Sequence, residues 1–152
     1  MSNSIALTDE ERESLLTQTK QWAVIATRNP KGMPHVVPVG FIFREGRLYI
    51  DSPKDTMKVR NVSETGVAAV TVDDGEDYAE LRGVMFQGNA EVREDPDLRE
   101  SLLERMAEKY FETREIPEYA MQANESVDRV TIVVDPSQTT SWDFRKAFGD
   151  RS

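Results

Sequence analysis

The chain contains no cysteine and a single histidine, His35, among its 152 residues. The lack of cysteine excludes disulfides, thiolate metal sites and thiol nucleophiles, and one histidine excludes any site that needs two imidazoles. A transition-metal site would need mostly carboxylates, and we expect no bound metal. No apolar run approaches the roughly 18 residues that span a bilayer, and residues 1–14 lack the basic and apolar regions of a signal peptide. We therefore expect a cytoplasmic protein with no membrane partner.

Positive charge is also scarce. The 28 Asp and Glu residues outnumber the 19 Lys and Arg residues, which gives a formal net charge of −9. A surface of this sign repels nucleic acid, so nucleic acid is not an expected partner. The acidity could serve solubility or reflect a host adapted to high salt, and charge alone does not distinguish these. The length and the hydrophobic content of 38% predict a single domain over residues 1–152 with a substantial core.

The distribution of β-forming residues predicts a meander of about seven antiparallel strands. The expected strands are residues 22–28, 33–43, 48–52, 66–73, 79–95, 128–136 and 139–144. Pro38 should interrupt the second of these or place it at a sheet edge. The segment 79–95 is either one long strand or a tight hairpin, with Gly83 and Gly88 as bulge or bend points.

Three helices are expected at turns of this meander. Thr8 and Glu11 have the spacing of a capping box, and Ser52-Pro53 is a suitable start for a short helix that ends near Val62. Asp95-Pro96 should begin a third helix, and its apolar residues Leu98, Leu102, Met106 and Tyr110 would share one face. Sequential hairpins with few helices predict a mainly β fold, a closed or nearly closed antiparallel barrel.

The stretch "DTMKVRN" (55–61) belongs to a local basic patch in an otherwise acidic chain. Residues 53–61 contain Lys54, Lys58 and Arg60 but only one acid, Asp55. A helix start carries free backbone N–H groups and partial positive charge. Together with the Ser52 and Thr56 hydroxyls and Lys58 it could hold a phosphate. The alternative is that these cations are simply solvated on an exposed helix.

Three other features have both a functional and a structural interpretation. His35 could donate a proton or a hydrogen bond to a cofactor ring, or be an ordinary strand histidine with a satisfied ring. Trp142 could form one wall of a planar cofactor site or fill the barrel. The acidic loop at residues 73–77 could bind a divalent cation, although it lacks the ligand spacing of an EF-hand, or be solvated.

The order of these segments resembles the pyridoxamine 5′-phosphate oxidase-like, FMN-binding split-barrel superfamily, and within it the small flavin- or deazaflavin-dependent branch. The resemblance rests on "WAVIATRNPKGMPHVVPVGFIF", "GRLYIDSPKDTMKVRNV", "GVAAVTVDD", "GVMFQGNAEVRED" and "TTSWDF", in that order. It covers roughly residues 8–145. It implies a split-barrel homodimer with two cofactor sites at the interface, each holding FMN or, alternatively, the deazaflavin coenzyme F-420.

The resemblance also implies roles for particular residues. Lys58 of the Lys-x-x-Asn motif would bind the cofactor phosphate, and Asn61 would fix the geometry of the helix. The remaining implied contacts to the cofactor are Ala26, Thr27, Arg28, Pro38, Val39, Ile50, Asp51, Ser52, Thr56 and Met57, to which we add Trp142 as a possible wall. No residue is expected to be catalytic by itself, although Thr27 or a strand N–H could polarise the ring.

Two positions depart from the pyridoxamine phosphate oxidases proper. Met57 stands where those enzymes have an arginine, and Gly83 stands where they tend to have a glutamine. The C-terminal Arg/His substrate segment of those enzymes is also missing. We therefore expect a flavin- or deazaflavin-dependent oxidoreductase that acts on another small molecule. The alternative is a non-catalytic flavin or heme carrier, or a stress-related protein, on the same barrel.

Overall fold

The computed structural model describes residues 4–112, 116–125 and 128–148. Within them, one seven-stranded antiparallel sheet has the strand order β2-β1-β5-β6-β7-β4-β3. The strands are β1 (Ala23–Arg28), β2 (Pro34–Val39), β3 (Ile42–Arg44), β4 (Arg47–Pro53), β5 (Val67–Asp74), β6 (Arg82–Arg93) and β7 (Arg129–Asp143). This confirms the expected mainly β, antiparallel split-barrel fold.

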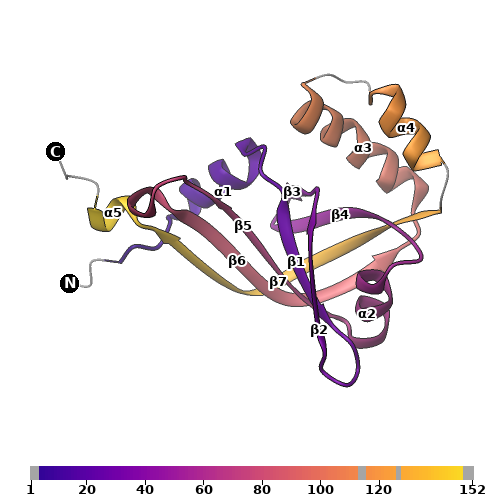
Figure 1. The fold of residues 1–152 in the computed structure, drawn as a ribbon, viewed down its shortest axis with the longest axis horizontal. Coiled ribbons are helices and arrows are strands. Elements are labelled where there is room, and N and C mark those ends of the chain that lie inside the picture. Colours follow the sequence, from indigo (N-terminus) through magenta and orange to yellow (C-terminus); the bar gives the residue numbers. More distant parts are fainter. Residues whose placement is uncertain (1–3, 113–115, 126–127, 149–152) are drawn as a thin grey trace.

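The sheet is strongly curled because consecutive strands occupy its two opposite edges. β2 and β3 are separated only by Gly40 and Phe41, yet every other strand lies between them in the sheet order. The sheet must therefore bend round into a half-barrel (Figure 1). The expected break at Pro38 is wrong: Pro38 lies within β2, and the break falls at the Gly40-Phe41 link. The expected edge position is correct, since an edge strand tolerates a missing N–H.

The last strand is continuous, whereas the sequence indicated two strands at 128–136 and 139–144. A register shift between Gln87 and Gly88 lets β6 stay paired with β7 on both sides of Pro136. Gly88 is therefore a bend point, as expected, and 79–95 contains one strand rather than a hairpin. A Cβ at Gly88 would lie 2.2 Å from a backbone carbonyl oxygen of β7, so this close approach requires glycine.

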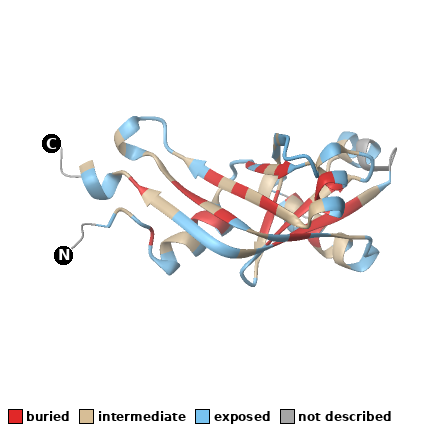
Figure 2. Ribbon diagram, turned by 90° about the horizontal axis from the view of Figure 1, so that it is seen from below, coloured by how far each residue is buried: buried red, intermediate tan, exposed pale blue. Residues whose placement is uncertain are grey.

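Buried and more exposed residues alternate along the strands (Figure 2), and the buried residues form an apolar core inside the half-barrel. The core includes Ile25, Phe41, Ile50, Val84 and Ile132, all fully buried. The period-2 alternation follows from strand geometry, because successive side chains face opposite sides of the sheet. In β1 it sends Ala23, Ile25 and Thr27 inward and leaves their neighbours more exposed.

Five α-helices and one short 3-10 helix surround the sheet in the described part of the chain. They are α1 (Asp9–Gln18), α2 (Met57–Thr65), η1 (Tyr78–Glu80), α3 (Pro96–Phe111), α4 (Glu118–Glu125) and α5 (Arg145–Phe148). The Thr8 capping box and the Asp95-Pro96 helix start are confirmed. The helices α4 and α5 were not expected from sequence. No helix in the described ranges is both long and apolar enough to cross a bilayer.

The third helix covers the outer face of the sheet near β4 and β7. Leu98, Leu102 and Met106 pack with Tyr49 and other apolar residues in a second, smaller cluster. Tyr110, from the same predicted face, stacks on the ring of Trp22 and accepts a hydrogen bond from the Phe41 backbone. α3 is therefore fastened to both β4 and the link between β2 and β3.

The start of the second helix differs from the expectation. α2 begins at Met57, not at Ser52-Pro53, because Ser52 and Pro53 pair with Val130 and Arg129 and so extend β4. The Ser52 hydroxyl donates to the Pro53 carbonyl at 2.9 Å instead of capping a helix. Strand pairing with a distant segment has here displaced a local capping preference.

Candidate cofactor site

The second helix is joined to the first strand by a buried amide. Asn61 is 1% exposed, and its Nδ2 donates to Thr27 Oγ1 at 3.1 Å. Asn61 Oδ1 is also buried and has no partner among the described residues, and the same holds for Nδ1 of His35. His35 is the cross-strand neighbour of Thr27. This end of β1 and β2 therefore presents unpaired polar atoms beside α2, which is where a polar ligand edge could be recognised.

The fourth strand has a free edge along its second half. In the described part of the chain, β3 pairs only with Arg47–Tyr49, so Ile50–Pro53 has no strand partner on that side. The outer edge of β2 likewise has no strand partner there. Ile50 and Ser52 point into the barrel and are fully buried. Both residues are therefore inaccessible from the surface of the protomer, in their backbone as well as in their side chains.

Asp51 points to the opposite face and binds two arginines. Its Oδ1 accepts from Arg99 Nε at 2.9 Å, and its Oδ2 accepts from Arg129 Nε at 2.7 Å. The carboxylate is only 6% exposed. Because one carboxylate faces two guanidinium groups, the cluster keeps an excess positive charge.

Lys58 adds a further cation beside this cluster. Its side chain is half-buried, and no carboxylate in the described part of the chain pairs with it. Burial, and then the nearby Arg129 charge, lower the pKa of Lys58. Lys54 behaves in the opposite way, because a bond of 2.5 Å to Glu94 raises its pKa. Of the two lysines, only Lys58 lacks a counter-charge, and an anionic ligand would supply it.

The start of α2 is open to such a ligand. Thr56 occupies the N-cap position, but its side chain makes no capping bond. Instead its hydroxyl donates to the Pro53 carbonyl at 3.1 Å and lies 3.3 Å from the Ser52 hydroxyl. The first-turn N–H groups thus lack a side-chain cap beside Lys58. The neighbouring Met57 is exposed. Both hydroxyls already donate to the Pro53 carbonyl, so the free N–H groups and the unpaired cation are the donors that could hold a phosphate.

Other predicted contacts lie elsewhere in the protomer. In β1, Thr27 points inward while Ala26 and Arg28 lie on the outer face. Pro38 and Val39 pair with the opposite end of β1, at Val24 and Ala23. The predicted cofactor contacts on β1 and β2 therefore lie on both faces of the sheet and near opposite ends of β1.

Trp142 is distant from Lys58 within one chain. It pairs with Gly83 at one end of β6 and β7, whereas Arg93 pairs with Thr131 at the other end. Ten residues of strand at about 3.3 Å each separate the two positions by roughly 33 Å. The indole also explains Gly83, since a Cβ there would lie 2.5 Å from the Trp142 ring. A glutamine at this position would collide with it.

The sequence did not point to the arginines or to a neighbouring apolar cavity. A cavity of about 240 Å³ is bounded by the Asp51 and Arg129 pair on one side and by aromatic and apolar residues on the other. Trp22 and Tyr110 stack in its wall with ring centres 4.6 Å apart. Ile116 and Ala120 also line it. Arg99 and Arg129 belong to no local motif, so only the folded chain identifies them.

The split half-barrel with an open, phosphate-compatible helix start agrees with the family comparison. The model of the pyridoxamine 5′-phosphate oxidase family matches residues 7–143. The chain belongs to this family. No protein of curated function matches it significantly.

Solved structures show the same fold. A conserved hypothetical protein from Mycobacterium tuberculosis is 23% identical with a TM-score of 0.79, covering 95% of this chain and 91% of that one. An F-420 reductase is 23% identical with a TM-score of 0.65, covering 84% and 94%. A heme storage protein from Vibrio cholerae is 15% identical with a TM-score of 0.68, covering 89% and 93%. At these identities the likeness establishes the fold alone.

Proposed function

We propose that the protein is a flavin-dependent oxidoreductase that binds FMN, or alternatively the deazaflavin coenzyme F-420, and transfers hydride to or from a small molecule. The observation that carries the proposal is the half-buried Lys58, which has no carboxylate partner in the described residues and lies beside Arg129 at the uncapped start of α2. Family membership supports a cofactor of this class, and the similarity to an F-420 reductase keeps the deazaflavin alternative.

Each part of the site has a separate task in this proposal. Lys58 and the first-turn N–H groups of α2 hold the cofactor phosphate. The Thr27–Asn61 pair orients the ring system. The cofactor, when bound, supplies the hydride chemistry, so the protein needs no nucleophile or acid-base pair of its own. Its apolar walls keep water away from the reacting centre.

A homodimer is part of the proposal. The outer face of β1 and β2 exposes Val24 and Val36, and Met33 lies exposed in the turn that precedes β2. Exposed apolar side chains that gather on one sheet face are typical of a protein interface. A second copy packed here would also place the outward-facing Ala26 and Arg28 at a subunit boundary. Sedimentation equilibrium should give twice the monomer mass, and a monomer at micromolar concentration would contradict this part.

The phosphate role is tested by a matched pair of lysine substitutions. Lys58→Ala should weaken FMN or F-420 binding at least tenfold, since a charge-assisted hydrogen bond contributes about 1.5–3 kcal/mol. Lys54→Ala should change the affinity less than threefold, because Lys54 is exposed and already paired with Glu94. Fluorescence titration of purified protein with each cofactor measures both affinities. Equal losses in the two variants would remove Lys58 from the site.

The alternative function is a non-catalytic carrier of flavin or heme, or a stress-related protein. The observation in its favour is the buried Nδ1 of His35, which has no partner among the described residues and could contact a bound group. Turnover with nicotinamide or reduced deazaflavin donors distinguishes the two functions. Cofactor binding without any hydride transfer would favour the carrier. Mass spectrometry of the cofactor released from protein made in its native host would identify it.

A further inference from the structure

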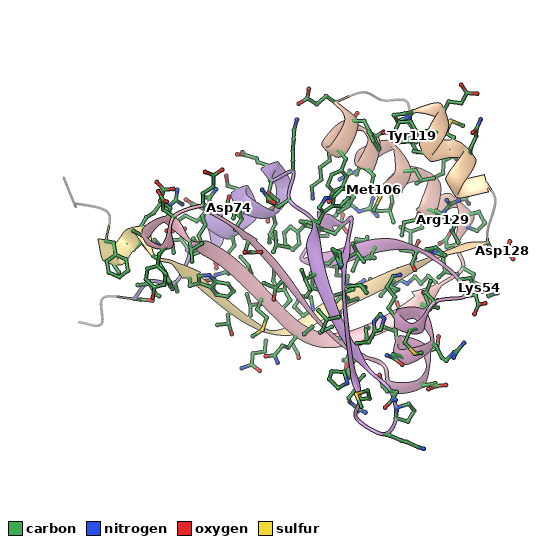
Figure 3. All side chains as sticks on the ribbon, viewed as in Figure 1. Lys54, Asp74, Met106, Tyr119, Asp128 and Arg129 are labelled. Carbon is green, nitrogen blue, oxygen red and sulfur yellow. The ribbon has the colours of Figure 1, made fainter. Side chains whose placement is uncertain are left out.

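A second cavity lies on the outer side of the sheet, where β4, β6 and β7 meet the start of α3. Its volume is about 390 Å³. Figure 3 shows Lys54, Asp128 and Arg129 together at this end of the molecule, far from Asp74 at the other end. The lining residues are Lys54, Arg93, Glu94, Asp95, Pro96, Arg99, Asp128, Arg129, Val130 and Thr131. Lys58 is not among them, so this cavity differs from the proposed phosphate site.

The arginines of the cavity are incompletely paired. Arg99 and Arg129 share the single carboxylate of Asp51, and each binds it through Nε. Arg99 Nη2 is buried and has no partner in the described part of the protein. A buried guanidinium nitrogen without an acceptor is costly, which indicates that an acceptor belongs beside it.

The hydroxyl of Thr131 is a second, independent indication. Thr131 is 1% exposed, and its Oγ1 has no hydrogen-bond partner in the described residues. It pairs across the sheet with Asp51 on one side and Arg93 on the other, so the three side chains share one face. Valine has the same shape and would avoid the cost of an unsatisfied hydroxyl. A threonine here is explained if the hydroxyl binds a ligand.

The acidic residues at the rim do not neutralise this floor. Glu94 is exposed and paired with Lys54, and the Asp95 side chain accepts from Leu98 N as the cap of α3. Asp128 is also exposed. An acidic rim above a cationic floor repels large polyanions and admits a small ligand with a single acidic group.

We propose that this cavity binds the oxyanion group, carboxylate or phosphate, of a small-molecule ligand through Arg99, Arg129 and the Thr131 hydroxyl. The cavity adjoins the cofactor phosphate site, because Arg129 lies beside Lys58, but Lys58 does not line it.

The test is isothermal titration of the purified full chain with inorganic phosphate and with succinate at constant ionic strength. The wild type should bind at least one of them saturably, and the tighter of the two identifies the group. Thr131→Val should weaken that binding at least fivefold without lowering the melting temperature, because the lost hydroxyl has no partner among the described residues. Thr139→Val, the same change at an exposed position of β7, should leave the affinity within twofold.

Three results would overturn the proposal. They are no saturable binding to the wild type, equal affinities in the wild type and Thr131→Val, and loss of oxyanion binding when FMN saturates the protein. The last result would mean that the cofactor phosphate occupies this cavity. If the protein binds neither FMN nor F-420, the proposed cofactor function fails, but the titration of the cofactor-free protein and the Thr131→Val comparison still decide the oxyanion proposal. Arg99→Gln should weaken oxyanion binding at least tenfold, and this loss of affinity is a second measure of the site.

Discussion

Replacement of Asp51 by asparagine tests whether one buried carboxylate holds β4, β7 and α3 together. Asp51 on β4 accepts from Arg99 on α3 at 2.9 Å and from Arg129 on β7 at 2.7 Å. Asparagine has nearly the same volume but carries no charge and only one acceptor oxygen. Asp51→Asn therefore removes at least one of the two bonds and leaves two guanidinium groups without a counter-charge.

The expected loss follows from these contacts. Removing one partner of a buried ion pair lowers the free energy of unfolding by about 3–5 kcal/mol. The arginine side chains keep 26% and 16% of their surface exposed, so water recovers part of this cost. We expect the free energy of unfolding to fall by about 2–3 kcal/mol, and the melting temperature by about 4–12 °C for a domain of this size.

Urea unfolding followed by tryptophan fluorescence measures this loss. The control is Asp135→Asn, which removes an exposed pair with Arg47 at 3.8 Å and should cost less than about 0.5 kcal/mol. The double variant Asp51→Asn with Arg99→Gln should lose less than the sum of the single losses, by about 1 kcal/mol, because the two residues share one bond. A loss below 1 kcal/mol for Asp51→Asn, or strict additivity, would refute the reasoning.

Three further predictions concern pH and packing. Burial lowers the pKa of Lys109, whose Nζ donates to the Phe41 carbonyl, from 10.5 to about 7. Between these values the unfolded chain binds more protons, so the free energy of unfolding should rise from pH 7 to 10.5; Lys109→Met should remove that rise in a urea series. Hydrogen bonds, first with Lys146, lower the pKa of Glu11 from 4.5 to about 2. The stabilisation from the ionised Glu11 should disappear as the pH falls from 4.5 to about 2. Glu11→Gln lacks this stabilisation at every pH, so its free energy of unfolding should fall less steeply over the same pH range. Gly88→Ala would place a methyl group 2.2 Å from a carbonyl oxygen of β7 and should cost about 3 kcal/mol; an unchanged melting temperature would contradict the bulge geometry.

Local signals predicted the elements whose structure is decided locally. The Thr8 capping box and the Asp95-Pro96 helix start appear as expected, because the bonds that satisfy these helix ends come from neighbouring residues. The apolar face of α3 was also readable from its periodicity. Ser52-Pro53 failed as a helix start because both residues pair with β7, more than 75 positions away. No local propensity reports such a pairing.

The residues of the candidate site likewise include some that the sequence predicted and some that it did not. Lys58 and Asn61 were found through their spacing in one short motif, and the structure shows Asn61 bonded to Thr27 and Lys58 without a carboxylate partner in the described residues. Their roles toward a cofactor remain predictions. Arg99 and Arg129 were missed because they come from different elements, and only folding brings their side chains together at Asp51.

The sequence by itself determined the strand-rich character, the family and the Lys58 motif, because alternation, turn residues and motif spacing are properties of nearby residues. It also showed that Lys54, Lys58 and Arg60 form a basic stretch in an acidic chain, but not which of them lacks a counter-charge. Only the tertiary structure decided that. It pairs Lys54 with Glu94, places Arg60 near Asp55 and leaves Lys58 half-buried beside Arg129. Charge compensation depends on distances between segments remote in sequence, and folding alone sets those distances.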